Sequence, residues 1–327
     1  MKKYFFMALA ALATLTACQQ PEEPTAMVND GTIKFMSAET RATVTTIDNL
    51  GTFNVYGYTE GETTLNIFGE TTTATKDGTV WKPSVTRYWA EGKTYNFFAV
   101  YAPNSDVDKI TSKAVDAAND KMTINFTNTT GNVDLVTAAS TNVTTLFNKS
   151  TGATPLAFQH ALARVAFQFN WGCTTGSDQT VEVTDVKLLG TKSTGVLTVA
   201  ANGDRTWTTS GENVTINYAA PATLTESAKL LPEVDATSGA GYQYIIPTEG
   251  LAPQIAFTAV VKDAQGTVLK TFNKSAGVNL PAQAYAAGKS YTFTMNINPQ
   301  FNDIQFTVTV ADWSDGGSSS LDFGNND

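Results

Sequence analysis

Histidine is nearly absent from this chain of 327 residues, in which His160 is the only one. A transition-metal site of usual composition needs several His or Cys ligands, so one histidine argues against such a site. Any nucleophile with a histidine base would have to use His160, and neither G-x-S-x-G nor G-x-x-x-x-G-K-S/T is present. His160 lies among apolar residues in segment 155–162, and we interpret it as a hydrogen-bonded structural residue. The sequence predicts no enzyme, no metal and no cofactor.

Cysteine is almost as rare, with Cys18 and Cys173 as the only two. Cys18 follows the single long apolar run, residues 4–15, which Lys2 and Lys3 precede. A short positive start, an apolar stretch and small residues before a cleavage point are typical of a secretory signal. The run is too short to cross a bilayer, which takes about 20 apolar residues. We therefore predict a signal peptide over residues 1–17.

The four residues 15–18 (LTAC) resemble a bacterial lipobox, in which cleavage leaves the cysteine first and acyl chains are attached to it. We expect Cys18 to carry lipid, and the membrane to be contacted through that lipid on the precursor. Residues 18–31 begin with a polar, Pro-containing stretch and are expected to form the lipidated tether. Acylation of Cys18 leaves Cys173 without a partner, so the fold cannot depend on a disulfide.

Basic residues are fewer than acidic ones, with 21 Lys and Arg against 30 Asp and Glu and a formal net charge of −9. Removal of residues 1–17 takes away two lysines but no acid, so the mature chain carries −11. This charge disfavours nucleic acid as a partner, because such binding depends on basic neutralisation of phosphate. Pairs of acids such as Asp312 and Asp315 would suit a glycosidase, but they are scattered, and we interpret them as solvated.

Alternation of apolar and polar residues with a period of two recurs along the chain, as in residues 122–126, 165–169, 291–297 and 304–310. Each such segment has one face for a core and one for water, which is typical of antiparallel sandwich strands. Residues 95–101 are apolar on both faces and suit a central strand. Residues 255–261 and 267–272 flank a Gly-containing loop and predict a hairpin. Helix is limited to one or two turns within 106–121 and within 282–287, so we predict an all-β protein.

A polar stretch with Gly and Pro, residues 148–155, separates two sets of predicted strands. The length of the chain is also usual for two domains. We therefore predict an N-terminal β-sandwich over residues 32–152 and a C-terminal β-sandwich over 153–327. Residues 314–320 (SDGGSSS) have the composition of a flexible linker, which makes the end of the second domain a flexible tail.

A series of short motifs follows the lipobox in a consistent order. They are residues 33–35 (IKF), 39–42 (ETRA), 53–58 (FNVYGY), 156–165 (LAFQHALARV), 244–247 (YIIP), 287–293 (AGKSYTF) and 311–313 (ADW). Each motif alone is weak, but together and in this order they are specific. Over nearly the whole mature chain, the sequence resembles the fimbrillin family (Mfa-like and FimA-like) of Bacteroidetes.

The resemblance implies two tandem transthyretin-like antiparallel β-sandwiches and a subunit of a surface pilus, with other pilus subunits as partners. It also implies that a trypsin-like protease cuts after an arginine in the loop that follows the first strand, and that a neighbouring subunit's strand then fills the groove. Here the removable strand would be residues 32–36, with Ile33 and Phe35 inward. The cut would follow Arg41 and leave Ala42 first. Arg41 is the only arginine before Arg87.

The donated strand has two candidates near the C-terminus, and both stay open. One is the pair Leu321 and Phe323, which follows the linker-like residues but makes a very short strand. The other has a longer apolar face that suits a groove and equally suits its own core: Ile304, Phe306, Val308 and Val310. A subunit with no donor would be a tip or accessory subunit.

Five tryptophans leave an alternative function open. Surface tryptophans stack on sugars, so the chain is alternatively a permanently anchored outer-membrane lipoprotein that binds a glycan or a host ligand. Packing in the core or at a domain junction is the more common role of tryptophan in a sandwich. Both functions place the secreted lipoprotein at the cell outer membrane or cell surface, and the first places it in a fimbrium with a role in adhesion.

Overall fold

The computed structural model describes residues 31–37, 50–103, 105–144, 152–171, 178–218, 222–225, 232–234, 240–281, 284–297, 305–312 and 318–321. Within these ranges the chain consists of strands in three sheets, and the only helical element is the 3₁₀ turn η2 (Ala117–Asn119). The predicted all-β class is confirmed. The expected helical turns in 106–121 are reduced to η2, because residues 109–116 pair along their length with a neighbouring strand.

The first sheet has eight strands. Their spatial order is β10 (Gln159–His160), β8 (Val136–Thr144), β5 (Thr94–Tyr101), β2 (Thr52–Thr59), β3 (Thr73–Asp77), β4 (Val80–Pro83), β1 (Phe35–Ser37) and β9 (Thr154–Leu156). β9 and β10 lie at opposite ends of this order. Only two residues of the chain separate them, however, and β9 also contacts β8. The sheet therefore curls around a core of its own.

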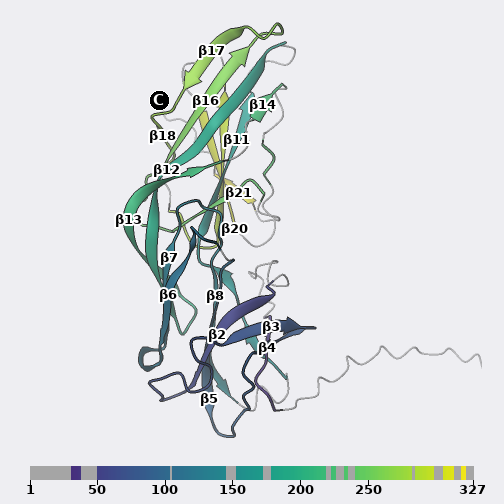
Figure 1. Cartoon of the computed structure of the whole chain (residues 1–327). Coiled ribbons are helices and arrows are strands. Elements are labelled where there is room, and N and C mark those ends of the chain that lie inside the picture. The colour runs from purple at the N-terminus through teal and green to yellow at the C-terminus, as the bar shows by residue number, and fades with distance from the viewer. Residues whose placement is uncertain are drawn as a thin grey trace, which may run out of the picture.

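The second and third sheets form the other part of the molecule. The second contains β17 (Val268–Asn273), β16 (Gln254–Lys262), β12 (Thr180–Ala200), β7 (Lys121–Thr127) and β6 (Lys109–Asp116), with β13 (Arg205–Asn217) and β14 (Ala222–Leu224) paired to β12 and β18 (Val278–Asn279) paired to β16. The third contains β15 (Gln243–Ile245), β11 (Ala163–Trp171), β19 (Lys289–Ile297), β20 (Gln305–Asp312) and β21 (Ser318–Leu321). The molecule is elongated, with β17 near one end and β5 near the other (Figure 1).

The 21-residue strand β12 runs along the second sheet and contributes to two separate clusters of buried side chains, with Leu188 in one and Leu197 in the other. Its residues 180–189 pair with β16, and its residues 194–200 pair with β7. A register shift at 184–187 contains Asp185, which has a left-handed φ of 55°. A bulge of this kind bends a strand and increases its twist, which suits a strand whose two halves pair with different neighbours.

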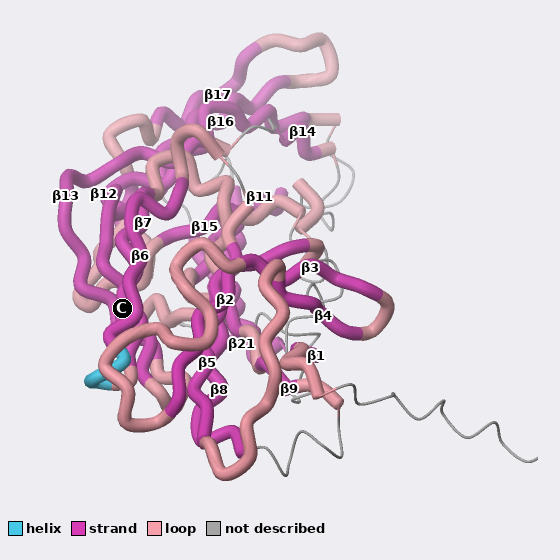
Figure 2. The backbone as a smooth tube through the Cα atoms, turned by 60° about the horizontal axis from the view of Figure 1, so that its bottom comes forward, coloured by secondary structure: helices cyan, strands magenta, loops and turns pink. Residues whose placement is uncertain are grey.

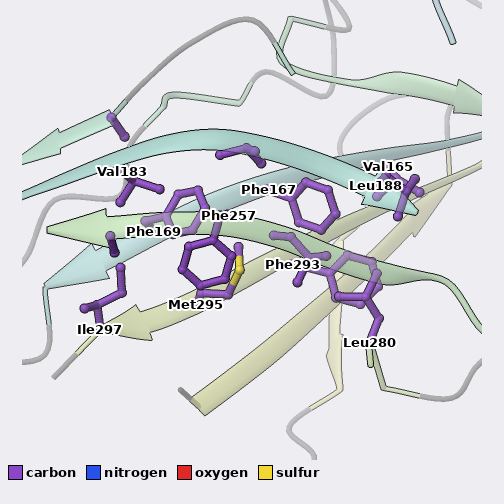
Figure 3. Packing of buried hydrophobic residues seen from close by; sticks show 14 of the residues in the cluster. Val165, Phe167, Phe169, Val183, Leu188, Phe257, Leu280, Phe293, Met295 and Ile297 are labelled. Carbon is purple, nitrogen blue, oxygen red and sulfur yellow. The ribbon is translucent and has the colours of Figure 1, made fainter. Parts of the chain in front are cut away.

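Three clusters of buried apolar side chains fill the spaces between and within the sheets. One lies inside the curled first sheet, and a second lies between that sheet and the β7 side of the second sheet. The third lies between the second and third sheets, where Phe257 packs against Phe169 with ring centroids 5.4 Å apart (Figure 3). The central strand predicted at residues 95–101 is β5, which is buried on both faces between the first two clusters.

The strand pairing continues across the boundary that we predicted at residues 152 and 153. β9, after the boundary, pairs with β1, and β7, before the boundary, pairs with β12. A polar stretch with Gly and Pro indicates a loop, but the sheet that the next strand joins depends on partners far away in sequence. The division into domains 32–152 and 153–327 stays a prediction.

A buried carboxylate holds the loop that follows β7. Asp108 is fully buried and accepts hydrogen bonds from the backbone N–H groups of Thr129 at 2.6 Å and Thr130 at 2.9 Å. It also accepts from the Asn132 N–H at 3.1 Å and from the Thr130 hydroxyl. Burial by itself raises the pKa of the Asp108 carboxyl, but these hydrogen bonds together outweigh it and lower the pKa below its ordinary value.

We expect Asp108→Asn to lower the free energy of unfolding at neutral pH by about 1–3 kcal/mol, because buried donors lose their charged acceptor. Since the folded pKa lies below the unfolded one, the stabilisation by Asp108 is present above the unfolded pKa and is lost as the pH falls through the folded pKa. The unmodified chain should therefore lose stability in acid more steeply than the variant. Urea unfolding at about pH 7 and about pH 3 measures both effects. Exposed Asp106→Asn is the control, and equal acid sensitivity of all three proteins would contradict the assignment.

Candidate functional site

The first strand lies inside the first sheet, with a neighbour on each side. β1 pairs antiparallel with β4, where Phe35 faces Trp81, and parallel with β9, where residues 35–37 face 154–156. Figure 2 shows β1 and β9 side by side at the border of the molecule. Ile33 and Phe35 are 1% and 0% exposed, and the residues between and after them, Lys34 and Met36, are partly exposed. Phe35 in β1 and Ile33, two residues before it, thus both reach the core.

Backbone hydrogen bonds hold this segment along both edges. On one side the Ile33 N–H donates to the Arg87 carbonyl at 2.8 Å, and the Gly31 carbonyl accepts from Trp89 at 3.0 Å. On the other side the Lys34 carbonyl accepts from the Thr154 N–H at 2.7 Å. An extended segment bonded on both edges leaves two rows of unpaired backbone groups if it is removed.

The side chain of Phe35 completes a group of three rings. Its ring centroid lies 5.2 Å from that of Phe97 and 6.0 Å from that of Phe68, both in edge-to-face geometry. The Phe68 and Phe97 centroids are 6.1 Å apart. Phe35 is thus the one ring of the three that the first strand contributes, and the other two come from the body of the sheet.

On the β9 side of the site, the chain continues from β9 into residues 159–161, which we call the wall of the site. Hydrogen bonds from the second sheet hold this wall and the adjoining strand β8. Arg205 on β13 donates to the Thr137 hydroxyl and carbonyl, both at 2.8 Å, and to the Gln159 side chain at 2.7 Å. Burial lowers the pKa of the Arg205 guanidinium to about 10, and the nearby charge of Asp204 opposes this shift. Next to Gln159, the Ala161 carbonyl accepts from the Trp207 indole at 2.7 Å.

The single histidine belongs to this same wall. The His160 ring nitrogen Nδ1 lies 2.6 Å from the Asp134 carboxylate, and His160 is 5% exposed. Its partner across the sheet is Val136 at the start of β8. These contacts agree with our interpretation of His160 as a hydrogen-bonded structural residue.

Several predicted residues lie outside the described part of the chain. These are Cys18 with the signal peptide and tether, Arg41 and Ala42 at the predicted cut, and Ile304 and Phe323 of the two donor candidates. Arg41 follows the end of β1 at Ser37 by four residues.

The two C-terminal candidates have different places in the third sheet. β20, with Phe306, Val308 and Val310, pairs with β19 over eight residues, and Val308 is fully buried in the core between the second and third sheets. β21, which ends at Leu321, is the outermost strand and pairs only with β20 among the described strands. β20 is therefore built into the core, whereas β21 lies at the edge of its sheet.

Comparison with family models matches residues 40–313 to the fimbrillin-like family. This chain belongs to the fimbrillin-like family. The match covers most of the sequence and confirms the resemblance inferred from the ordered motifs. A search of the curated proteins found no match.

Solved structures with the fold of this fimbrillin-like chain include proteins from Bacteroides. A fimbrial protein from Bacteroides vulgatus shares 20% of its residues over 86% of this chain and 99% of that protein, with a TM-score of 0.68. A proposed cell adhesion protein from Bacteroides uniformis shares 15% over 87% of this chain and all of that protein (100%), with a TM-score of 0.51. At these identities the similarity shows the fold.

Other kinds of site have little support in the described part of this fimbrillin-like chain. No group of three His, Cys, Asp or Glu side chains there is arranged to hold a metal ion. Among the same residues, none of the helices has the length and apolar character that crossing a membrane requires. Trp81 and Trp171 are buried, and Trp89 and Trp207 are partly buried, so the four described tryptophans form no exposed platform for a sugar.

The resemblance to this family placed the first strand at residues 32–36, whereas β1 spans Phe35–Ser37 and Ile33 lies two residues before it. The residues that surround this segment were not predicted. Phe68, Phe97 and Arg205 lie 33 to 170 residues from Phe35 in the chain, and no local pattern connects them with it. Segment 156–165 is one of the family motifs and contains His160, which we interpreted as a structural residue, and the structure adds the tertiary contacts of this segment. Gln159, His160 and Ala161 each receive a tertiary contact that holds the wall next to β1.

We expect Phe35→Ala to lower the free energy of unfolding of the uncleaved chain by about 3–5 kcal/mol, because it removes a fully buried ring from a packed cluster. Met36→Ala, at the next and partly exposed position, should cost less than about 1 kcal/mol. Urea unfolding followed by tryptophan fluorescence measures both variants. Similar losses for the two variants would show that the first strand is not anchored through Phe35.

We expect Arg205→Met to cost about 1–3 kcal/mol, because the buried Thr137 carbonyl and the Gln159 side chain lose their donor. Hydrogen exchange should show faster exchange of the amides in β8 and β10 in this variant. Lys109→Met, an exposed position on β6, provides the matched control. Unchanged protection of β8 and β10 would contradict the assigned role of Arg205.

Proposed function

We propose that this chain is a structural or tip subunit of a surface fimbria, without enzymatic activity and with a role in adhesion. It is exported as a lipoprotein acylated at Cys18 and assembled by donor-strand exchange after cleavage between Arg41 and Ala42. The observation that carries the proposal is the setting of β1. β1 and the residues just before it carry two buried apolar side chains and are bonded on both edges, and four residues after β1 comes the only arginine before Arg87.

The energetics of removing this strand favour its replacement. Loss of residues 31–37 exposes backbone groups of β4 and β9 together with the pockets of Ile33 and Phe35. A strand from a neighbouring subunit satisfies both needs, because main-chain bonds give affinity and alternate side chains give register. Donation from head to tail does not close on itself and produces a filament, which is the geometry of a fimbria.

Of the two C-terminal candidates, we propose the segment with Leu321 and Phe323 as the donor. Withdrawal of β20 would take Val308 out of a core cluster and remove eight paired residues from β19. Withdrawal of β21 breaks pairing with one strand only. The edge strand is therefore the less costly one to release.

The lipid on Cys18 has a temporary role in this proposal. Several acyl chains anchor a protein firmly, and they would hold the precursor at the outer membrane. A cut after Arg41 separates Cys18 and the first strand from the rest of the chain. The same step thus releases the subunit from the membrane and empties the groove. Its partners are then other fimbrial subunits and a ligand on a host or bacterial surface.

The mature N-terminus tests this proposal. Mass spectrometry of the protein taken from the surface of its native cells should find chains that begin at Ala42 within high-mass oligomers. Arg41→Ala should abolish both the new N-terminus and the oligomers. Arg41→Lys distinguishes a trypsin-like protease from a protease specific for arginine. The variant keeps a cleavage site for the first enzyme, which also cuts after lysine, but not for the second.

A different result would favour the alternative function. If every chain begins at acylated Cys18 and no oligomers form, the polymerising function is wrong. The chain would then be a permanently anchored surface lipoprotein, and titration with glycans would be the next measurement.

A further inference from the structure

The floor of the groove beneath Phe35 contains a glycine in close contact with aromatic rings. Gly57 on β2 exchanges backbone hydrogen bonds with Phe68, at 3.0 and 3.1 Å. A Cβ atom added to Gly57 would lie 3.0 Å from ring carbons of both Phe68 and Phe97. The two rings that contact Phe35 therefore occupy space that a side chain at position 57 would take.

We infer that Gly57, Phe68 and Phe97 form a pocket that selects an aromatic side chain on any strand that occupies the groove. This inference rests on the proposed strand exchange and specifies which strand the groove accepts. Edge-to-face ring pairs stabilise beyond the area that they bury, and Phe35 makes two of them. An aliphatic side chain in the same place makes neither.

The groove has a second pocket, which Ile33 occupies. This pocket fixes the spacing between the two apolar residues of an incoming strand. Ile33 is buried two residues before Phe35, and both belong to the core inside the first sheet. Because alternate residues of a strand point to the same face, an incoming strand that runs in the direction of β1 must present an aliphatic residue and then an aromatic residue two positions later. Its intervening residue faces outward, as the partly exposed Lys34 does.

The partner that fits is the C-terminal segment of a second copy of this chain. Leu321, Asp322 and Phe323 carry the required pattern, with Asp322 at the outward position. Ile304 and Phe306 carry it as well, but the strand that contains Phe306 is built into its own sheet. We therefore assign Leu321 to the Ile33 pocket and Phe323 to the Phe35 pocket.

A double-mutant cycle on the full, uncleaved chain tests the pocket itself. Phe35→Leu and Gly57→Ala should each lower the midpoint of urea unfolding. In the double variant the loss should be clearly smaller than the sum, because Leu fits the pocket that the added methyl group narrows. Gly69→Ala, where an added Cβ meets nothing within 4 Å, is the control and should show no coupling with Phe35→Leu. Additive losses at Gly57 would overturn the inference.

Peptide displacement tests selection by the emptied groove. The full chain is cut after Arg41 with an arginine-specific protease, and a peptide of residues 319–325 is added. Release of the fragment that ends at Arg41 is then followed by mass spectrometry. A peptide with Phe323→Leu should need an about tenfold higher concentration, which corresponds to the loss of both ring pairs. Asp322→Asn at the outward position is the control and should act like the unmodified peptide.

The outcomes separate this inference from the proposed function. Equal displacement by the Phe and Leu peptides leaves strand exchange intact and overturns aromatic selection. Failure of every peptide, including one of residues 31–37, overturns strand exchange and with it this inference. A Gly57→Ala chain that prefers the Leu peptide would support the pocket directly, and one that keeps the preference for Phe would contradict it.

Discussion

The backbone groups of β4 and β9 face a gap that one extended strand must fill. β1 and the residues just before it fill this gap with hydrogen bonds on both edges and with the side chains of Ile33 and Phe35, which reach the core. The curled first sheet depends on this strand, because β9 has no other ladder partner among the described strands. A strand that is essential to a sheet, yet only three residues long and near the start of the fold, is well placed to be exchanged.

The β9 side of the gap is held by contacts that do not involve β1. Arg205 and Trp207 reach from the second sheet to Gln159 and Ala161, which continue directly from β9. The His160–Asp134 pair adds a third contact in the same segment. Since these contacts do not involve β1, they keep the wall in place whichever strand lies beside it. The same segment then runs into β11, so the wall of the groove and the third sheet share one continuous piece of chain.

The proposed strand exchange needs no reactive side chain, because backbone pairing and apolar burial would supply the binding energy. In this proposal the specificity comes from the shape of the pockets, of which the one around Phe35 is the most sharply defined. Its glycine floor is a close-packing feature, since Gly57 has an ordinary strand conformation and is there for space and not for a special φ.

The sequence by itself determined the all-β class, the β16–β17 hairpin and the central strand at 95–101. The class follows from alternation with a period of two, the hairpin from a Gly-containing loop between two apolar segments, and the central strand from a segment that is apolar on both faces. The inward pair Ile33 and Phe35 was expected from the family resemblance. Only the tertiary structure decided that β1 pairs with β9, that Phe35 meets Phe68 and Phe97 above Gly57, and that Arg205 holds β8 and β10. These contacts join residues far apart in the chain, and alternation says which face a side chain takes but not which strand lies beside it.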